Sequence, residues 1–233
     1  MIGEPRTHVP ECASTQLLLP PDAPEGAIAT TDHQTAGRGR LGRQWVEAPG
    51  TAVLVSVLLR PPPERQAPEL SLLAAVAVAR AVESVGRVAA VVKWPNDVVL
   101  ADRKVAGILA ELRAGAVVLG IGLNVNQTPE QLPADGKLAP TSLRLETGRE
   151  HDRERILEAL LAALDTAYRS WRESGLGGVL EDLRRRDFLQ GRRVAVGDVH
   201  GVAAGIDEAG RLRVRTAHGV EAVASGEVVL PPA

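Results

Sequence analysis

Residues 37–43 read Gly-Arg-Gly-Arg-Leu-Gly-Arg, and the fold class depends on how this stretch is interpreted. Its glycines match the dinucleotide-binding fingerprint G-x-G-x-x-G, after which a helix opens at once and an acid follows about 20 residues on. Here residues 45–50 lead instead into a second apolar segment, 51–59, and residues 51–63 contain no acid. We therefore reject a doubly wound Rossmann fold.

The same stretch has the composition of a ligand-binding loop. It holds three arginines, and no acid lies between Asp32 and Glu47 to neutralise them. Glycines let a backbone approach a ligand closely, and guanidinium groups pair with phosphate and carboxylate oxygens. We expect a mobile anion-binding loop that is disordered without ligand and closes over it. A solvated surface loop and a nucleic-acid arm are the alternatives, the latter usually set among basic residues and stacking aromatics.

Composition limits the other possibilities. The 233 residues are 45% hydrophobic and 24% charged, which suits one globular domain and a small second one. A net charge of −2 gives no general attraction to nucleic acid or anionic membranes. The single cysteine, Cys12, excludes an internal disulfide framework. Without a leader-like segment or a membrane-spanning run, we expect a cytoplasmic protein.

Apolar patterning around the loop predicts an α+β fold with a mixed β-sheet packed against helices. Residues 51–59 are almost continuously apolar and rich in β-branched residues, as in a buried strand. Residues 69–85 have the composition of a largely buried helix. The other expected segments are a lead-in over 1–12, a short helix over 16–19, strands at 27–31, 88–93 and 117–125, and a hairpin with arms 98–101 and 104–113.

The C-terminal part of the sequence, from about residue 150, has a different pattern of residues. Asp152 is placed to cap an amphipathic helix ending near Trp171, and a shorter helix is expected over 179–186. From Arg192 onward, short valine-containing runs alternate with glycines, which predicts five short strands in a small β-barrel. We therefore expect two domains, 1–187 and 188–233.

Polar residues gather in four islands, beside strands in three cases. They are Ser14-Thr15-Gln16, residues 34–43, Lys93-Trp94-Pro95-Asn96-Asp97 with Lys104-Val105-Ala106-Gly107, and residues 120–126. Each island alone is weak, because capping and turn formation explain Ser14, Asn96 and Asp97 equally well. Five scattered histidines give no ligand spacing, so no protein-held metal is expected.

In this order, the islands resemble biotin protein ligases over roughly residues 12–145. The resemblance implies a class II synthetase-like catalytic domain followed by a small SH3-like barrel. Gln16 departs from the asparagine that usually follows Ser-Thr in this family. About a dozen residues precede Ser14, too few for the winged helix of some members, so the monofunctional type is expected.

The resemblance also implies a two-step reaction using biotin, ATP and Mg²⁺. Biotinyl-5′-AMP forms first, and biotin then passes to a lysine of the biotin carboxyl carrier protein, without DNA or membrane partners. Arg38, Arg40 and Lys104 would bring the carboxylate and phosphates together, and Asp97 would orient or deprotonate the acceptor lysine. Biotin contacts are expected from Ser14, Thr15, Gln16, Gln34, Gly37, Arg38, Gly39, Arg40, Lys104 and Gly107. Adenylate contacts are expected from Arg40, Arg43, Trp45, Lys93, Asn96, Lys104, Asn124 and Asn126.

Three other functions remain open at this level: a lipoate or octanoate ligase of the same fold, a nucleic-acid-binding regulator, and a biotin-binding module without catalysis. The paired motifs at 37–43 and 93–97 favour biotin over lipoate. The number of cations disfavours a pure binding module, because biotin's ureido ring is neutral. Valine-rich strands offer edges to a partner, so both a monomer and a homodimer remain possible.

Overall fold

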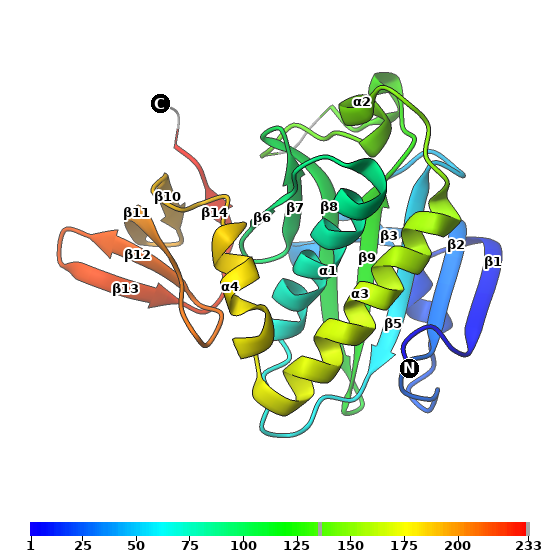
Figure 1. Ribbon diagram of the computed structural model, residues 1–233, viewed down its shortest axis with the longest axis horizontal. Helices are drawn as coiled ribbons and strands as arrows, with labels where there is room; N and C mark the ends of the chain where they lie inside the picture. Colours follow the sequence, from blue (N-terminus) through cyan, green and yellow to red (C-terminus); the bar gives the residue numbers. More distant parts are fainter. Residues whose placement is uncertain (135–136, 232–233) are drawn as a thin grey trace.

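The computed structural model describes residues 1–134 and 137–231. Its main feature is a seven-stranded sheet with the order β1-β2-β5-β9-β8-β7-β6 (Figure 1). β1 runs parallel to β2, and the other neighbours are antiparallel. The strands are β1 (Arg6–Cys12), β2 (Ile28–Gln34), β5 (Ala52–Leu59), β6 (Val91–Lys93), β7 (Asp97–Leu100), β8 (Arg103–Arg113) and β9 (Ala116–Asn124). The mixed sheet expected from the sequence is confirmed.

The centre of the sheet is its most apolar part. Every residue of β5 is buried, and β5 pairs with β9 from Ala52↔Asn124 to Leu59↔Val117. Alternate residues of β5 point to opposite faces, so Val53, Val55 and Val57 join the main core. Leu58 lies in a smaller cluster on the other face. The continuous apolar run is needed because both faces of this strand are covered.

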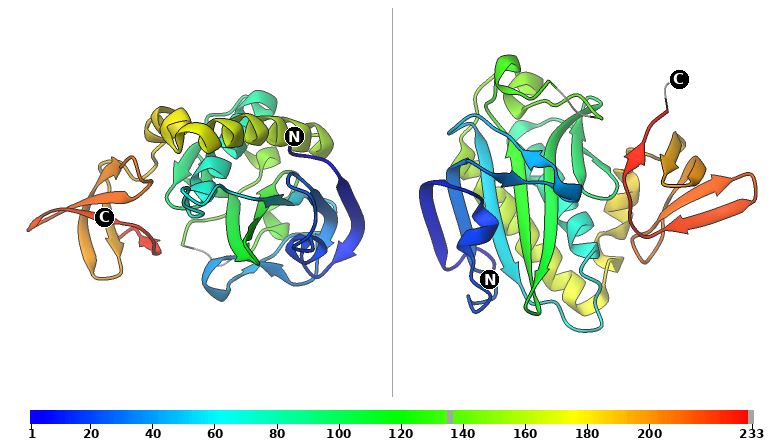
Figure 2. Two further views of the ribbon diagram at one scale, coloured as in Figure 1. Left: turned by 90° about the horizontal axis from the view of Figure 1, so that it is seen from below. Right: turned by 180° about the vertical axis from the view of Figure 1, so that it is seen from behind.

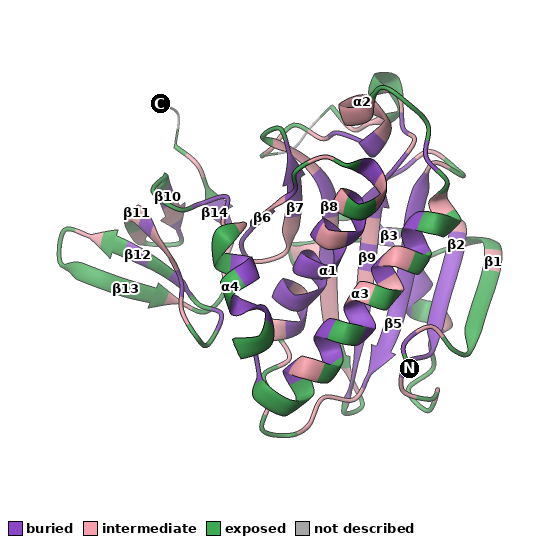
Figure 3. Ribbon diagram, viewed as in Figure 1, coloured by how far each residue is buried: buried purple, intermediate pink, exposed green. Residues whose placement is uncertain are grey.

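Two long helices, α1 (Glu69–Gly86) and α3 (Arg153–Ser174), cover one face of the sheet (Figure 2). Most residues of α1 and a stripe of residues along α3 are buried (Figure 3). Asp152 caps α3 as predicted, because its carboxylate accepts the backbone N–H groups of Glu154 and Arg155. The opposite face is crossed by a two-stranded pair, β3 (Gly37–Arg38) and β4 (Gln44–Trp45), joined by the 3₁₀ turn η2 (Arg40–Gly42). The main sheet is accompanied by three further short elements: the 3₁₀ turns η1 (Thr15–Leu18) and η3 (Pro129–Gln131), and the helix α2 (Leu143–Thr147).

The C-terminal unit is a five-stranded antiparallel sheet that follows α4 (Gly177–Arg185). Its order is β13 (Gly219–Val223), β12 (Leu212–Thr216), β11 (Val199–Ile206), β10 (Arg193–Val196) and β14 (Val228–Val229). The five expected strands are present, but within residues 137–231 the end strands β13 and β14 do not pair, so the expected barrel is open. The indole N–H of Trp94 donates to the carbonyl of Gly210 over 2.9 Å, which joins this unit to the main sheet.

The main difference from the sequence interpretation lies at the N-terminus. The expected extended lead-in contains an edge strand, β1, in register with β2 from Arg6↔Ile28 to Cys12↔Gln34. Most of its residues are exposed, and it contains Pro10, which is tolerated at a sheet edge. An exposed strand interrupted by proline lacks the apolar alternation that identifies strands locally. The boundary at residues 187/188 stays a prediction. Among the described residues, no helix has both the length and the apolar character for a membrane span.

Candidate active site

A cavity of about 230 Å³ is lined by residues of β3, η2 and β4. These three elements cross the sheet face away from the long helices (Figure 2). Three glycines and Ser56 lie on this face of the strands below the cavity, beside Leu109. Ser56, Gly120 and Leu109 are cross-strand neighbours, and so are Gly122 and Gly107. A cavity can exist here because three of these five residues are glycines, which have no side chain to fill the space.

One side of the cavity is neutral, and we call Ser14, Thr15, Gln16 and Gln34 the polar floor. Gln34 Oε1 accepts the Thr15 backbone N–H over 2.9 Å, and the Thr15 hydroxyl lies 2.7 Å from that of Ser56. Gln16 Nε2 donates to the Leu109 carbonyl over 3.0 Å. Ser14, Thr15 and Gln16 are each buried. The side chains of Thr15, Gln16 and Gln34 are therefore fixed by protein atoms and do not depend on a ligand for their orientation.

The other side carries the charge, and we call Arg40, Arg43, Lys93, Lys104 and Lys137 the cationic wall. These side chains come from η2 and the residue after it, β6, β8 and the loop before α2. Of the described carboxylates, only Asp97 and Glu227 line the cavity with them. The cavity is thus strongly positive in a chain whose net charge is −2. Such a surface suits phosphate or carboxylate oxygens.

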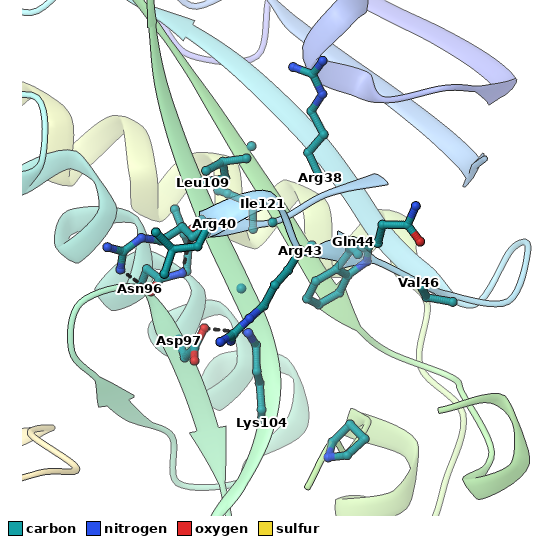
Figure 4. Close-up of a pocket in the computed structure, with 18 of the residues that line it drawn as sticks. Arg38, Arg40, Arg43, Gln44, Val46, Asn96, Asp97, Lys104, Leu109 and Ile121 are labelled. Carbon is teal, nitrogen blue, oxygen red and sulfur yellow. Dashed lines mark hydrogen bonds and ion pairs between the residues drawn. The ribbon is translucent and has the colours of Figure 1, made fainter. Parts of the chain in front are cut away.

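Lys104 and Asp97 form the ion pair at the centre of the wall, with Lys104 Nζ 2.7 Å from Asp97 Oδ1 (Figure 4). Lys104 and Gly107 would face opposite ways in a regular strand, because they are three residues apart. The register between β7 and β8 shifts between Val98 and Val99, as in a β-bulge. The bulge brings Lys104 to the face that carries Asp97. The β-sheet irregularity thus assembles the pair.

The arginines of residues 37–43 point in different directions (Figure 4). Arg40 Nη1 donates to Asn96 Oδ1 over 2.9 Å, and Arg43 is directed toward Lys104 and Asp97. Arg43 also forms an ion pair with Glu227, whose other oxygen lies 2.7 Å from Lys137 Nζ. These contacts hold the loop in place over the cavity.

Arg38 is different, because it points away from Lys104 and lies 3.5 Å from Glu111. In this arrangement its guanidinium does not contribute to the wall. Glu111 is shared with Arg113, which forms a shorter ion pair with the same carboxylate oxygen. A catalytic Arg38 would therefore have to leave Glu111.

Burial changes the acid–base properties of the wall. Burial lowers the pKa of Lys93, whose side chain is almost inaccessible and reaches the carbonyl of Val228 at 3.4 Å. Burial likewise lowers the pKa of Arg40. The pKa of Glu227 is lowered mainly by its hydrogen bond with Lys137, and Arg43 lowers it further. An anionic ligand would stabilise the charged forms of Lys93 and Arg40, because it would supply negative charge next to these buried cations.

Trp45 covers the two glycines at the base of the cavity. A Cβ built at Gly122 would lie 2.5 Å from the Trp45 ring, and one at Gly107 would lie 3.1 Å from it. Glycine is required at position 122 because the indole rests directly on the strand. The buried indole N–H has no hydrogen-bond partner among the described residues. A ligand acceptor would satisfy it.

Most of the predicted site residues meet in this cavity, but two do not line it. Gly37 lies under the carbonyl of Trp45, which a Cβ at position 37 would strike, so glycine allows the β3–β4 pair to close. Asn126 exchanges hydrogen bonds with the backbone of His151, over 2.8 and 2.9 Å. Its amide is used to hold the loop before α3. Asn124 does line the cavity, while its amide N–H donates to Thr141.

The sequence interpretation missed several lining residues, notably Lys137, Gly226 and Glu227. They lie in a proline-containing loop and in the C-terminal unit, outside the motif islands. An isolated lysine or glutamate in such segments gives no local signal of a site. Among residues 1–134 and 137–231, no three His, Cys, Asp or Glu side chains lie together as metal ligands would.

Comparison with known proteins places this cavity in context. The sequence model of the "Biotin/lipoate A/B protein ligase family" matches residues 9–127, and that of the "Biotin protein ligase C terminal domain" matches residues 191–230. The biotin–[acetyl-CoA-carboxylase] ligase of Mycobacterium tuberculosis is 39% identical over 219 residues, which is 88% of this chain and 79% of that protein. The bifunctional ligase/repressor BirA of Bacillus subtilis is 35% identical over 221 residues, 90% of this chain and 67% of that protein.

A solved structure matches the whole arrangement. The biotin protein ligase of Aquifex aeolicus, in complex with biotin and ATP, has a TM-score of 0.89 at 30% identity. The match covers 99% of this chain and 100% of that chain. Both the main sheet and the C-terminal unit therefore have counterparts in that enzyme.

Proposed function

The chain belongs to the biotin/lipoate A/B protein ligase family, and from this premise we propose that it is an ATP-dependent biotin–protein ligase. The observation that carries the proposal is the division of the cavity into a fixed polar floor and a cationic wall. Biotin has a neutral ureido ring at one end and a carboxylate at the other. The floor suits the ring, and the wall suits the carboxylate together with the phosphates of ATP.

In the first half-reaction, a biotin carboxylate oxygen attacks the α-phosphorus of ATP. A new P–O bond forms as the bond to the β-phosphate bridging oxygen breaks, giving biotinyl-5′-AMP and pyrophosphate. The two reactants repel each other, so Arg40, Arg43 and Lys104 would act by positioning and by charge stabilisation. Arg38 would join them after leaving Glu111, and Lys93 and Asn96 would support the nucleotide side.

In the second half-reaction, the amine of an acceptor lysine attacks the carbonyl carbon of the mixed anhydride. The C–O bond breaks, AMP leaves, and the amine loses a proton. Asp97 faces Lys104 on the wall and is the carboxylate we assign to orient this amine and accept its proton. The proposed acceptor is the lysine of a biotin carboxyl carrier protein.

Mg²⁺ would accompany ATP and lower the charge of its phosphates. The two lining carboxylates already pair with Lys104, Lys137 and Arg43. Phosphate oxygens and water would therefore be the main ligands of the ion. A cytoplasmic location and a homodimer stay predictions, and sedimentation of the purified protein tests the latter.

Pyrophosphate release and biotinyl-AMP formation should be measured with biotin, ATP and Mg²⁺ in the absence of an acceptor. We expect a burst equal to the enzyme concentration, followed by biotin transfer when the carrier protein is added. Lipoate replaces biotin in a parallel assay to test the related ligase activity. Biotin binding without adenylate would contradict the proposed reaction and leave a binding module.

A further inference from the structure

We propose that Arg113 is a positioning residue for ligand recognition: it fixes the direction of the Gln16 amide, and with Gly120 it determines which ring the polar floor accepts. The inference rests on the function proposed above. Arg113 ends β8, outside the polar islands and outside the lining of the cavity. Its guanidinium nevertheless reaches Gln16 twice, through Nη1 to the backbone carbonyl at 2.7 Å and through Nη2 to Oε1 at 3.4 Å.

The direction of the Gln16 amide follows from its two neighbours. Nε2 donates to the Leu109 carbonyl, and Oε1 faces the guanidinium of Arg113. Turning the amide over would place an oxygen against a carbonyl and an NH₂ group against a cation. Both contacts would then be repulsive, since guanidinium has only donors and a carbonyl only accepts. Arg113 and Leu109 therefore select one of the two orientations.

The fixed amide has hydrogen-bonding capacity left for a ligand. A glutamine amide carries two N–H donors and two acceptor lone pairs, and the contacts above use one of each. Gln16 is 2% exposed and lines the cavity, so water cannot easily satisfy the remainder. A cyclic urea presents both N–H donors and a carbonyl acceptor. A dithiolane ring presents no such donor and would leave the buried amide unpaired, which is a strong basis for rejection.

Gly120 makes room for this side chain. A Cβ at Gly120 would lie 2.7 Å from Gln16 Nε2 and 3.3 Å from its Cδ and Cγ. The amide cannot move aside without losing its contacts with Leu109 and Arg113. A shorter amide at position 16 would free this space but could not keep both contacts. Gln16 and Gly120 are therefore a matched pair that sets the depth of the floor.

The first experiment measures biotin affinity by calorimetry in the complete protein. Arg113→Met removes both contacts to Gln16 while keeping a long side chain, and we expect biotin to bind about fivefold to tenfold more weakly. In the Gln16→Asn background the same change should have a smaller effect, because only the contact with the backbone carbonyl of residue 16 is then lost. The KM for ATP should stay unchanged in Arg113→Met. Arg60→Met is the matched control, since Arg60 also donates to two backbone carbonyls, of Pro21 and Ala23, but lies away from the cavity.

The second experiment tests the matched pair. Gly120→Ala should weaken biotin binding in the Gln16 protein, and Gln16→Asn should restore part of that loss in the double variant. Thermal unfolding of each variant separates loss of folding from loss of recognition. Equal effects of Arg113→Met in both backgrounds, or strictly additive effects at positions 16 and 120, would overturn the inference. If the unmodified protein bound no biotin at all, the proposed function would fail first, and independently of these cycles.

Discussion

The polar floor and the cationic wall share one cavity but are built on different principles. The floor is neutral, and its hydrogen bonds run to backbone groups and to the side chains of Gln34, Ser56 and Arg113. The wall is charged, and two of its lysines and Arg43 are held by Asp97 and Glu227. Anions of a ligand can replace such carboxylates, whereas they cannot replace a backbone carbonyl. The cavity therefore separates a neutral surface with fixed contacts, proposed for recognition, from a charged surface with exchangeable contacts, proposed for the chemistry.

The variant with the largest expected effect tests whether the reaction depends on the cationic wall and not on the polar floor. Lys104→Met removes the central cation, and we expect the rate of biotinyl-AMP formation to fall about a hundredfold to a thousandfold. Biotin amide, which lacks the carboxylate charge, should bind almost as well as before because its ring contacts the floor. Single-turnover pyrophosphate release and calorimetry give the two values. A comparable loss in biotin amide affinity would break the separation.

Asp97→Asn sharpens the comparison within the wall. The change keeps the shape of the side chain but removes its charge, so we expect transfer to the acceptor lysine to slow by about a hundredfold or more. Adenylation should slow less, because Lys104 remains although its partner at 2.7 Å has become neutral. The two half-reactions are timed separately, with isolated biotinyl-AMP supplied for the second. Unchanged transfer would show that Asp97 only supports the turn before it, formed by residues 94–96.

Lys93→Met tests whether a buried cation of the wall lowers the stability of the folded protein. Lys93 is buried, and no carboxylate of the described residues forms an ion pair with it, so replacing it by an apolar chain of similar length should raise the Tm by about 2–4 °C. The KM for ATP should rise at the same time.

The pH dependence of Lys93 has a definite sign. Burial lowers its pKa in the folded state, so between that value and the ordinary lysine pKa the unfolded chain binds more protons. The free energy of unfolding should therefore increase with pH across this window, and Lys93→Met should remove that increase. Denaturant unfolding at several alkaline pH values measures both. A lower Tm in Lys93→Met would mean that the cation is well compensated in the folded protein.

Glu227→Gln is expected to have the smallest effect and tests the exchangeable contacts directly. Glu227 holds Arg43 and Lys137, so its loss should speed hydrogen exchange of the amides in residues 37–46 in the unliganded protein. With biotin and ATP bound, the difference from the unmodified protein should disappear because phosphates take over both cations. Glu208→Gln is a control on an exposed turn of the C-terminal unit. Equal exchange in both variants would leave the loop held by other contacts.

The fold was largely predictable because its central elements have clear local patterns. The fully apolar β5, the helix α1 and the hairpin of β7 and β8 all lie within a few residues of the expected positions. Strand β1 was missed because an exposed edge strand has no apolar alternation. The open C-terminal sheet also differs from the expected barrel, since closure depends on the pairing of β13 with β14 and not on the strands themselves.

The sequence predicted a set of site residues but not their geometry. Residue types and motif order selected Gln34, Arg40, Asp97 and Lys104, which line one cavity, and their roles stay predictions. The bulge that turns Lys104 toward Asp97, the bonds that divert Asn126 to His151, and the wall residue Lys137 depend on long-range packing. No local periodicity contains that information.

The contribution of residues 226–228 to the cavity has a consequence for synthesis of the protein. Glu227 meets Arg43 across 184 positions of the chain, and Lys93 reaches Val228 across 135. The polar floor and the strands beneath it all precede residue 125, whereas these two partners of the wall follow about a hundred residues later. The charged wall is therefore complete only after residues 227 and 228 have been made.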